Sequence, residues 1–433
     1  MRIAIIGAGA AGCICAVECK RLRPAAEVTV YEAGKVPLAK VAVTGGGRCN
    51  IANTFAGIGL AGKAAGRREL REVYPRGYRL MQKLLHDFGP EDTVRWFAAE
   101  GVRLKEEDGG RLFPVTDDAR TVVNALLAAM KREGVHVLTG KALCRLTPPT
   151  AGDTATENHG QWQLSFKDGS VASADAVVIC AGGMKAEKGA SEHGGFLQGL
   201  GIDTVPPVPS LFTFNIPDRG LRELMGTTVR GAAVKLAGTR LETHGDILIT
   251  HWGLSGPAVL RLSSYAAREL AARGYKADIC VRWMADSGDG ETGQPSADAW
   301  IKDNIARYPA RQCTSVHPDN IPSRLWEFLL QRAALRPDLR WGELGSKGAA
   351  RLAAVLSADT YHIDGQTRFR EEFVTCGGVA LSAVHADTLE SRRHPGLYFA
   401  GEILDIDAVT GGFNLQAAWT TGITAARGLA AED

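Results

Sequence analysis

The apolar residues at the start of the chain predict a strand, a helix and a second strand. Arg2 to Ile6 is a short apolar run, Ala10 to Leu22 has the periodicity of a helix, and Glu27 to Tyr31 is again strand-like. A glycine turn separates the first two elements. A strand, helix and strand in this order form a βαβ unit, so we expect an α/β fold with a parallel sheet.

The same patterns place further elements in the first half of the chain. Gln161 to Phe166 alternates and is followed by Asp168-Gly169, which predicts a surface hairpin. Ala174 to Cys180 is almost continuously apolar, as expected for a strand in the centre of a sheet. Periodicity also predicts helices at Glu91 to Glu100 and Ala119 to Glu133 and a strand at Val135 to Thr139.

A proline-rich segment, Val205 to Ser210, marks the first domain boundary. Its prolines fix the backbone and interrupt helix and central-strand patterns. Leu211 to Thr250 is strand-like, whereas Pro257 to Ala272 and Ile321 to Ala334 are helical in pattern. From Phe373 the character of the first domain returns. We expect a first domain from residues 1–204 and 373–433, a β-rich insert from 205–255 and 356–372, and a helical insert from 256–355.

The length of the chain predicts more than one domain, and its charge does not favour a nucleic-acid-binding or membrane-binding protein. A chain of 433 residues is too long for one hydrophobic core, which supports the multidomain prediction. The 50 basic and 48 acidic side chains give a formal charge of +2, so charge provides no general attraction to nucleic acid or to a membrane. We interpret the arginines between Arg67 and Arg79 as a solvated helix face. A small-molecule substrate is the expected partner.

Residue spacing argues against disulfides, metals and membrane segments. The nine cysteines lack paired spacing, and Cys13, Cys15 and Cys19 fall where a helix must pack on the sheet, so we expect reduced thiols. The histidines, including His251, lack metal-ligand spacing, so we expect no metal. No run of 18 apolar residues occurs and the first strand begins at Arg2, so we expect a cytoplasmic protein without a cleavable leader.

A glycine motif between the first strand and helix predicts a dinucleotide site. Gly7 permits the tight turn, Gly9 lets the backbone approach a pyrophosphate, and Gly12 lets the helix pack on the strand. The helix N-terminus favours the negative charge of the phosphates. Glu32, at the end of the second strand, can accept hydrogen bonds from the adenosine ribose.

Three later segments favour FAD over NAD as the dinucleotide. The glycine-rich loop Val43 to Asn50 can bind phosphate or a flat ring edge through its amides, with Arg48 as a further donor. Gly401-Glu402 follows a strand where the ribityl and pyrophosphate would pass. Gly411 to Gln416 opens a helix whose first amides can stabilise charge on the flavin pyrimidine. The GxGxxG motif at Gly7 is the one that lies between a predicted strand and a predicted helix, and it is assigned to FAD, so any NAD(P)H would bind transiently.

Five motifs carry a resemblance to a known family: KVAVTGGGRCN, EEDGGRLFP, THWGLSGPAVL, VTCGGVAL and GLYFAGEILDIDAVTGGFNLQAAW. They occur in order over nearly the whole chain, which thereby resembles the BaiN/RdsA-like (YhiN-type) FAD-dependent flavoproteins. The resemblance implies a glutathione-reductase-like (Rossmann) FAD-binding domain built from both ends of the chain, interrupted by a β-barrel domain that carries a helical insert. One departure is MKAEKGASEHGGF after Gly183, where the family has a tyrosine-containing turn; the conformation of the 184–196 loop is left open.

The residues expected to contact FAD come from all of these segments. They are Gly7, Gly9, Ala10, Ala11, Gly12, Glu32, Ala33, Lys40, Gly45, Gly46, Gly47, Arg48, Cys49, Asn50, Val137, Ala181, Gly182, Gly401, Glu402, Asp407, Gly412, Phe413, Asn414, Leu415 and Gln416.

Two side chains are candidates for catalysis. Cys49, beside the glycine loop, could be a redox partner of the flavin, although disulfide reductases need a second nearby thiol and no CxxC motif is present. Cys376 invites the same interpretation. Arg111 could hold a carbonyl or carboxylate of the substrate, and a structural salt bridge is the alternative.

We expect an FAD-dependent oxidoreductase that transfers hydride between flavin and a small or hydrophobic organic substrate, with NAD(P)H as a candidate reductant. Residues 205–370 are expected to set substrate specificity. The alternatives are an oxygen-using amine oxidase, an RNA-modifying or RNA-binding flavoprotein suggested by the arginines near Arg67, and a non-catalytic flavin scaffold. The substrate, the electron donor and the oligomeric state stay open.

Overall fold

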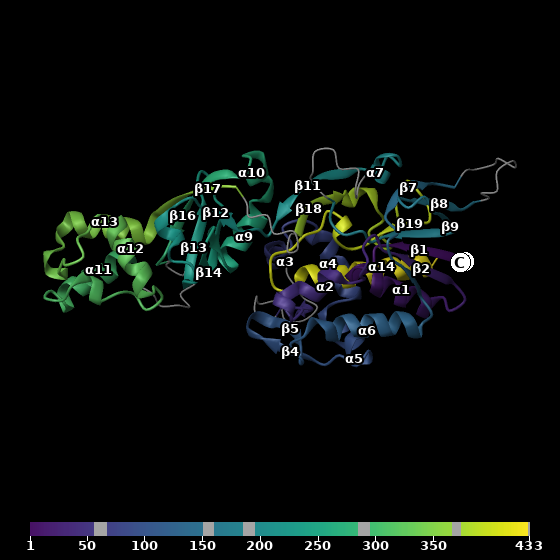
Figure 1. Ribbon diagram of the computed structural model, residues 1–433, viewed down its shortest axis with the longest axis horizontal. Helices are drawn as coiled ribbons and strands as arrows, with labels where there is room; N and C mark the ends of the chain where they lie inside the picture. The colour runs from purple at the N-terminus through teal and green to yellow at the C-terminus, as the bar shows by residue number, and fades with distance from the viewer. Residues whose placement is uncertain (56–66, 150–159, 185–194, 285–294, 366–373, 432–433) are drawn as a thin grey trace. The chain divides into compact units, whose positions relative to one another are not determined.

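Both ends of the chain build one compact unit, and a second unit is inserted between them (Figure 1). The computed structural model describes residues 1–55, 67–149, 160–184, 195–284, 295–365 and 374–431. The first unit consists of Met1–Ser210 with Arg370–Asp433, and the second of Leu211–Phe369.

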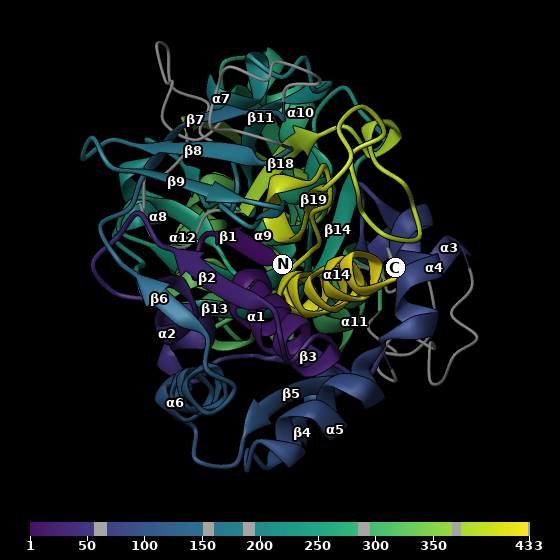
Figure 2. The same cartoon turned by 90° about the vertical axis from the view of Figure 1, so that its right-hand side faces the viewer.

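A five-stranded parallel sheet forms the centre of the first unit, in the order β19-β10-β1-β2-β6. The buried strands are short apolar runs, as is typical of parallel sheets. The strands are β1 (Arg2–Ile6), β2 (Glu27–Tyr31), β6 (His136–Leu138), β10 (Ala176–Ile179) and β19 (Leu397–Phe399). Helix α1 (Ala10–Leu22) packs on β2 and along α14 (Phe413–Ala430), so segments from the two ends of the chain lie side by side (Figure 2).

Smaller antiparallel sheets complete the first unit. The strands β3 (Ala52–Asn53), β5 (Arg111–Pro114) and β4 (Leu104–Glu107) form one, and β7 (Leu143–Thr147), β8 (Trp162–Phe166) and β9 (Val171–Ala174) form another. A third pairs β11 (Thr204–Ser210) with β18 (Val374–Val379). The remaining helices are α2 (Ala39–Val43), α3 (Arg67–Val73), α4 (Tyr78–Asp87), α5 (Pro90–Ala99), α6 (Ala119–Arg132) and α7 (Gly195–Gln198).

The second unit is built on a six-stranded antiparallel sheet in the order β12-β15-β14-β13-β16-β17. Asn215 N donates to Gly365 O (3.1 Å), so the first and last strands meet and the sheet is a nearly closed barrel. The strands are β12 (Phe214–Asn215), β13 (Thr228–Leu236), β14 (Glu242–Thr250), β15 (Gly253–Ser255), β16 (Lys276–Arg282) and β17 (Asp359–Asp364). The helices are α8 (Arg219–Arg222), α9 (Pro257–Tyr265), α10 (Ala267–Ala272), α11 (Ala297–Arg307), α12 (Ser323–Arg332) and α13 (Gly345–Ala358).

The predicted fold class is confirmed, and two strands differ from their predicted form. The proline-rich segment is itself a strand, β11. It tolerates prolines because it pairs only with β18 and its register shifts between Val205 and Val208. The apolar run predicted at Ala174 to Cys180 is divided at Asp175, whose carboxylate accepts a hydrogen bond from Arg2 N (2.5 Å).

A third difference concerns the insert. Strand β16 pairs with β13 and β17, although it lies within the range 256–355 that we expected to be helical. Its side chains alternate between buried and less buried positions, as in a sheet with one face in the core. Parts of the loops at 147–160, 184–196 and 286–298, and of the arginine-bearing stretch 63–83, lie outside the described residues. Within the described ranges, no helix combines the length and apolar character needed to cross a membrane.

Candidate cofactor site

The glycine turn after β1 is crowded at two of its glycines and open at the third. A Cβ at Gly12 would lie 1.9 Å from Gly7 O, and a Cβ at Gly7 would lie 2.3 Å from Cys180 O. Nothing lies within 4 Å of a Cβ built at Gly9. The first turn of α1, which contains Ala10 and Ala11, has no acidic residue and no side-chain cap. An open space beside uncapped helix amides fits the pyrophosphate of a dinucleotide.

Glu32 lies beside this turn at the end of β2. Its Oε2 accepts a hydrogen bond from Ala8 N (2.7 Å) and its Oε1 accepts one from Gly34 N (2.7 Å). Each carboxylate oxygen can accept another hydrogen bond, so Glu32 can still bind ribose hydroxyls. Glu32 N donates to Leu138 O (2.8 Å), which brings the neighbouring Ala33 and Val137 to the same end of the sheet.

The second glycine loop meets the start of α14 through Asn50. The loop Thr44–Gly47 is a tight turn in which Gly45 and Gly46 have left-handed φ angles of 58° and 68°, followed by Gly47. Asn50 Oδ1 accepts a hydrogen bond from Gly412 N (3.2 Å), and its Nδ2 donates to Ala52 O (3.0 Å). Gly412 has a φ of 93°, and a Cβ there would lie 2.4 Å from Ala52 O, so this approach requires glycine.

The first turn of α14 presents amides to a ligand. Gln416 N is the first to bond within the helix, to Gly412 O (3.0 Å), which leaves the amides of Phe413, Asn414 and Leu415 for another acceptor. No acidic residue lies in this turn. The side chain of Gln416, by contrast, is buried between Thr93 and Thr420 (3.1 and 3.0 Å), so only its backbone can serve the predicted site.

Glu402 follows β19 and lies among three other residues that are predicted to contact FAD: Lys40, Gly182 and Gly401. Its carboxylate pairs with Lys40 Nζ (3.5 Å) and accepts a hydrogen bond from Thr375 N (2.8 Å). A Cβ at Gly182, which follows Ala181, would lie 3.7 Å from the same Lys40 Nζ. Gly401 N donates to Thr421 Oγ1 of α14 (2.8 Å). The structure thus brings these residues together, and their contact with FAD stays a prediction.

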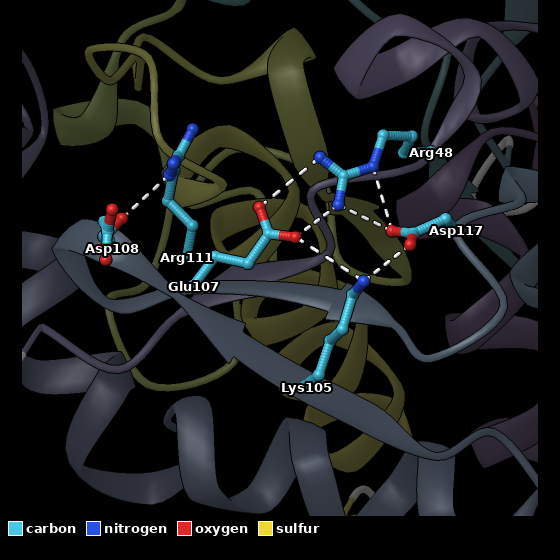
Figure 3. A network of polar contacts seen from close by, with 6 residues as sticks. All are labelled: Arg48, Lys105, Glu107, Asp108, Arg111 and Asp117. Carbon is cyan, nitrogen blue, oxygen red and sulfur yellow. Dashed lines mark hydrogen bonds and ion pairs between the residues drawn. The ribbon is translucent and has the colours of Figure 1, made fainter.

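Arg48 is held by carboxylates from the β4–β5 hairpin (Figure 3). Its guanidinium pairs with Glu107 and with Asp117 Oδ1 (2.6 Å) and lies 4.2 Å from the centre of the Phe113 ring. Lys105 Nζ donates to Asp117 Oδ2 (2.5 Å). Hydrogen bonds from Lys105 and Arg48 lower the pKa of Asp117, so this carboxylate stays charged. These pairs make Arg48 a support of the glycine loop, and its contact with the cofactor stays a prediction.

Asp407 is buried in an ion pair. Arg76 Nε donates to its Oδ1 (2.5 Å), Arg76 Nη2 pairs with its Oδ2, and Ser210 Oγ donates to Oδ2 (2.8 Å). Burial raises the pKa of Asp407, while Arg76 and Ser210 favour the carboxylate. Asn414 clamps the same loop through both its amide atoms to Ala408 (2.9 Å each). These side chains therefore fix the loop before α14.

The two cysteines considered for redox chemistry, Cys49 and Cys376, are buried. Burial raises the pKa of Cys49 to about 11, so almost none of it is thiolate near pH 7. Cys376 is also buried, and all nine cysteines are free thiols. This environment gives no support to the redox interpretation of Cys49. In the part of the chain that the structure describes, no group of three or more His, Cys, Asp or Glu side chains could hold a metal ion.

Two site residues escaped the sequence analysis. Asn53 Nδ2 donates to Gly109 O and to Gly411 O (3.0 Å each), which ties the hairpin tip to the turn before α14. Phe113 packs under the glycine loop, with its Cε1 at 3.4 Å from a Cβ built at Gly45. Phe113 lies within the motif EEDGGRLFP, whereas Asn53 lies three residues after KVAVTGGGRCN, and only the pairing of β3 with β5 shows that these segments meet.

The fold and this site define an FAD-dependent oxidoreductase built on a Rossmann domain. The chain belongs to the HI0933-like family, whose Rossmann-domain model matches residues 1–428. The resemblance found in the sequence motifs is thereby confirmed.

Curated relatives match along their whole length. The chain is 26% identical to a 3-dehydro-bile acid delta(4,6)-reductase from Clostridium scindens, over 99% of each chain. It is 27% identical to a ribosomal RNA dihydrouridine synthase from Escherichia coli, over 99% of this chain and 97% of the relative. The Haemophilus influenzae protein of the same name is 25% identical, over 98% of this chain and 96% of the relative.

Two solved structures have the same fold. The 3-ketosteroid-delta4-(5alpha)-dehydrogenase from Rhodococcus jostii RHA1 has a TM-score of 0.52 and 15% identity, covering 99% of this chain and 96% of that one. The 3-ketosteroid delta1-dehydrogenase from Sterolibacterium denitrificans has a TM-score of 0.52 and 12% identity, covering 100% and 99%. At such identities the likeness shows a shared fold alone.

Proposed function

We propose that this protein reduces a carbon–carbon double bond conjugated to a carbonyl group, using electrons that NAD(P)H delivers to bound FAD. The observation that carries the proposal is the full-length similarity to relatives with two different names. A 3-dehydro delta(4,6) bile acid has such a double bond beside its ketone, and the formation of dihydrouridine reduces the double bond of uracil beside a carbonyl. The shared chemistry is the reduction of an activated double bond.

The residues of the first unit supply what this chemistry needs from a protein. Bound FAD would accept a hydride from the donor and pass it to the substrate. The open space at Gly9 and the amides of α1 would hold the pyrophosphate, and Glu32 would hold the ribose. The amides at the start of α14 would stabilise negative charge on the flavin pyrimidine. The GxGxxG motif between β1 and α1 is assigned to FAD, so the nicotinamide would bind transiently.

The RNA relatives make a second substrate class, uridine in ribosomal RNA, a candidate for the same site. The sequence motivation for RNA was the run of arginines up to Arg79. One of them, Arg76, is instead buried in its pair with Asp407. The RNA candidate therefore depends on the relatives and would act by the same reduction.

Anaerobic stopped-flow absorbance of the flavin tests the proposal. The protein is mixed with NADH or NADPH, and the reduced flavin is then mixed with a 3-keto delta(4,6) bile acid, with unmodified ribosomal RNA, or with the saturated ketone as a control. We expect reoxidation by one conjugated acceptor, with gain of two hydrogen atoms by that acceptor, and none by the saturated ketone. Reoxidation by air alone, with peroxide formed, would favour the amine oxidase alternative and contradict the proposal.

A further inference from the structure

The three-stranded sheet β3-β5-β4 has one face in the core and one polar face. Ala52 and Leu112 lie opposite each other, and both are buried in the hydrophobic core. Because side chains alternate along a strand, Asn53 and Arg111, which also lie opposite each other, project from the other face. Glu107 is paired with Arg111 across β4 and shares this polar face.

The side chain of Asn53 connects the polar face of this sheet to the turn before α14. Its Nδ2 bonds to Gly411 O (3.0 Å), one residue before the left-handed Gly412 that opens the helix. Directly opposite residues in an antiparallel pair have Cβ atoms about 4.5–5.5 Å apart. The side chain of Arg111 therefore starts beside that of Asn53, which reaches the turn before α14.

The ion pairs among the described residues of this polar face do not include Arg111. Glu107 and Asp117 pair with Arg48, and Asp117 also pairs with Lys105. Arg111 donates through Nε to Asp108 O (2.9 Å), and Figure 3 shows its guanidinium beside Asp108, away from the paired groups. Among the described residues its two terminal nitrogens have no acceptor within hydrogen-bond distance, although its charge helps to lower the pKa of Glu107.

We infer that Arg111 binds the carbonyl oxygen of the conjugated substrate and stabilises the negative charge that develops there. The inference rests on the proposed function and adds the residue that recognises its substrate class. The backbone bond to Asp108 fixes the direction of the guanidinium, so the two terminal nitrogens form a planar fork of donors held in advance of binding.

The chemical step balances with the reductant already named. A hydride adds to the β-carbon and forms a carbon–hydrogen bond. The electron pair of the carbon–carbon double bond then joins the α-carbon to the carbonyl carbon, and the electron pair of the carbonyl double bond moves to the oxygen. A proton from solvent then adds to the α-carbon. Reduced FAD is oxidised as the hydride donor, and NAD(P)H restores it. The negative oxygen is the species for which a charged donor matters most.

Arg111→Gln and Arg111→Lys test this role in the holoenzyme, with the two half-reactions measured separately. We expect Arg111→Gln to bind FAD and to be reduced by the nicotinamide at a rate within about twofold of wild type. Its reoxidation by the conjugated acceptor should be about 100-fold to 1,000-fold slower, as when one donor to a developing oxyanion is removed. Arg111→Lys, which keeps the charge without the fork, should lie between the two.

Arg120→Gln is the matched control, because Arg120 is an exposed arginine of the same unit that pairs with Asp118. It should leave both half-reactions unchanged. Equal reoxidation of Arg111→Gln and wild type would overturn the inference while leaving the proposed function intact. Loss of FAD and slowing of both half-reactions would show a merely structural arginine. If wild type itself reduces no conjugated acceptor, the proposed function fails and the inference fails with it.

Discussion

Single glycines decide how closely α1, β1 and the cofactor approach one another. Gly12 and Gly9 belong to the same motif, yet their surroundings are opposite: backbone atoms crowd the first and nothing lies near the second. The motif alone predicts both glycines but cannot tell which serves packing and which serves the ligand. This difference gives a matched pair of variants.

Gly12→Ala and Gly9→Ala should separate folding from cofactor binding. The Cβ of Gly12→Ala would meet Gly7 O, so we expect a loss of about 3 kcal/mol in the free energy of unfolding of the apoprotein. Gly9→Ala should fold normally and bind FAD at least about tenfold more weakly, because its Cβ enters the pyrophosphate space. Denaturant unfolding and flavin fluorescence titration measure the two effects. Unchanged FAD affinity in Gly9→Ala would mean that the pyrophosphate lies elsewhere.

Side chains whose partners are distant in sequence were the least predictable. The glycine motif after β1 and Glu32 were predicted from local spacing, and in the structure they lie together at one end of the parallel sheet. The ion pairs of Arg48 could not be predicted, because nothing in the sequence shows that Glu107 and Asp117, 59 and 69 residues away, fold back onto it. Asn53 gave no local signal, since its partners come from a hairpin tip and from the far end of the chain.

Among the elements, β17 is tied to the helical part of its unit by one buried carboxylate. Asp359 accepts hydrogen bonds from Trp283 Nε1 (3.0 Å), Tyr361 Oη (2.5 Å) and Arg332 Nε (2.9 Å). The periodicity of β17 could be read from the sequence, but this junction could not, because it joins groups from three elements.

Asp359→Ala should destabilise the second unit far more than a change at the exposed end of the same strand. Removal of the carboxylate leaves the buried donors of Trp283 and Tyr361 without this acceptor and leaves Arg332 with Asp218 (3.1 Å) as its remaining carboxylate, which we expect to cost about 3–5 kcal/mol. Asp364→Ala breaks only a surface pair with Lys276 (2.9 Å) and should cost less than about 1 kcal/mol. Thermal unfolding followed by circular dichroism compares them, and equal effects would refute the importance of the buried network.

The whole molecule is two units joined where β11 and β18 run side by side. The sequence predicted an insertion, from the prolines after Val205 and the return of the first pattern near Phe373. The structure ends the first segment at Ser210 and resumes it at Arg370. The sequence did not predict that β11 and β18, the segments on either side of the insertion, pair as strands, because prolines are rare in sheets.

Ser210 lies opposite Val374, so a short hairpin can replace the entire inserted unit. We expect a chain in which an Asn-Gly turn replaces residues 211–373 to bind FAD, because the groups described for the cofactor lie in the first unit. Residues 211–369 alone should unfold in a single cooperative transition. Flavin absorbance after desalting and calorimetry measure these outcomes, and a shortened chain that is folded but colourless would contradict the first.

The packing of α1 against α14 also sets an order of events on the ribosome. The nucleotide-binding turn is synthesised long before α14, the helix that covers α1 and completes the cofactor site. The inserted unit is continuous in sequence and can finish folding earlier. Until α14 has been synthesised, the apolar side of α1 stays uncovered, so we expect chaperones and proteases to bind this stretch of a nascent or truncated chain.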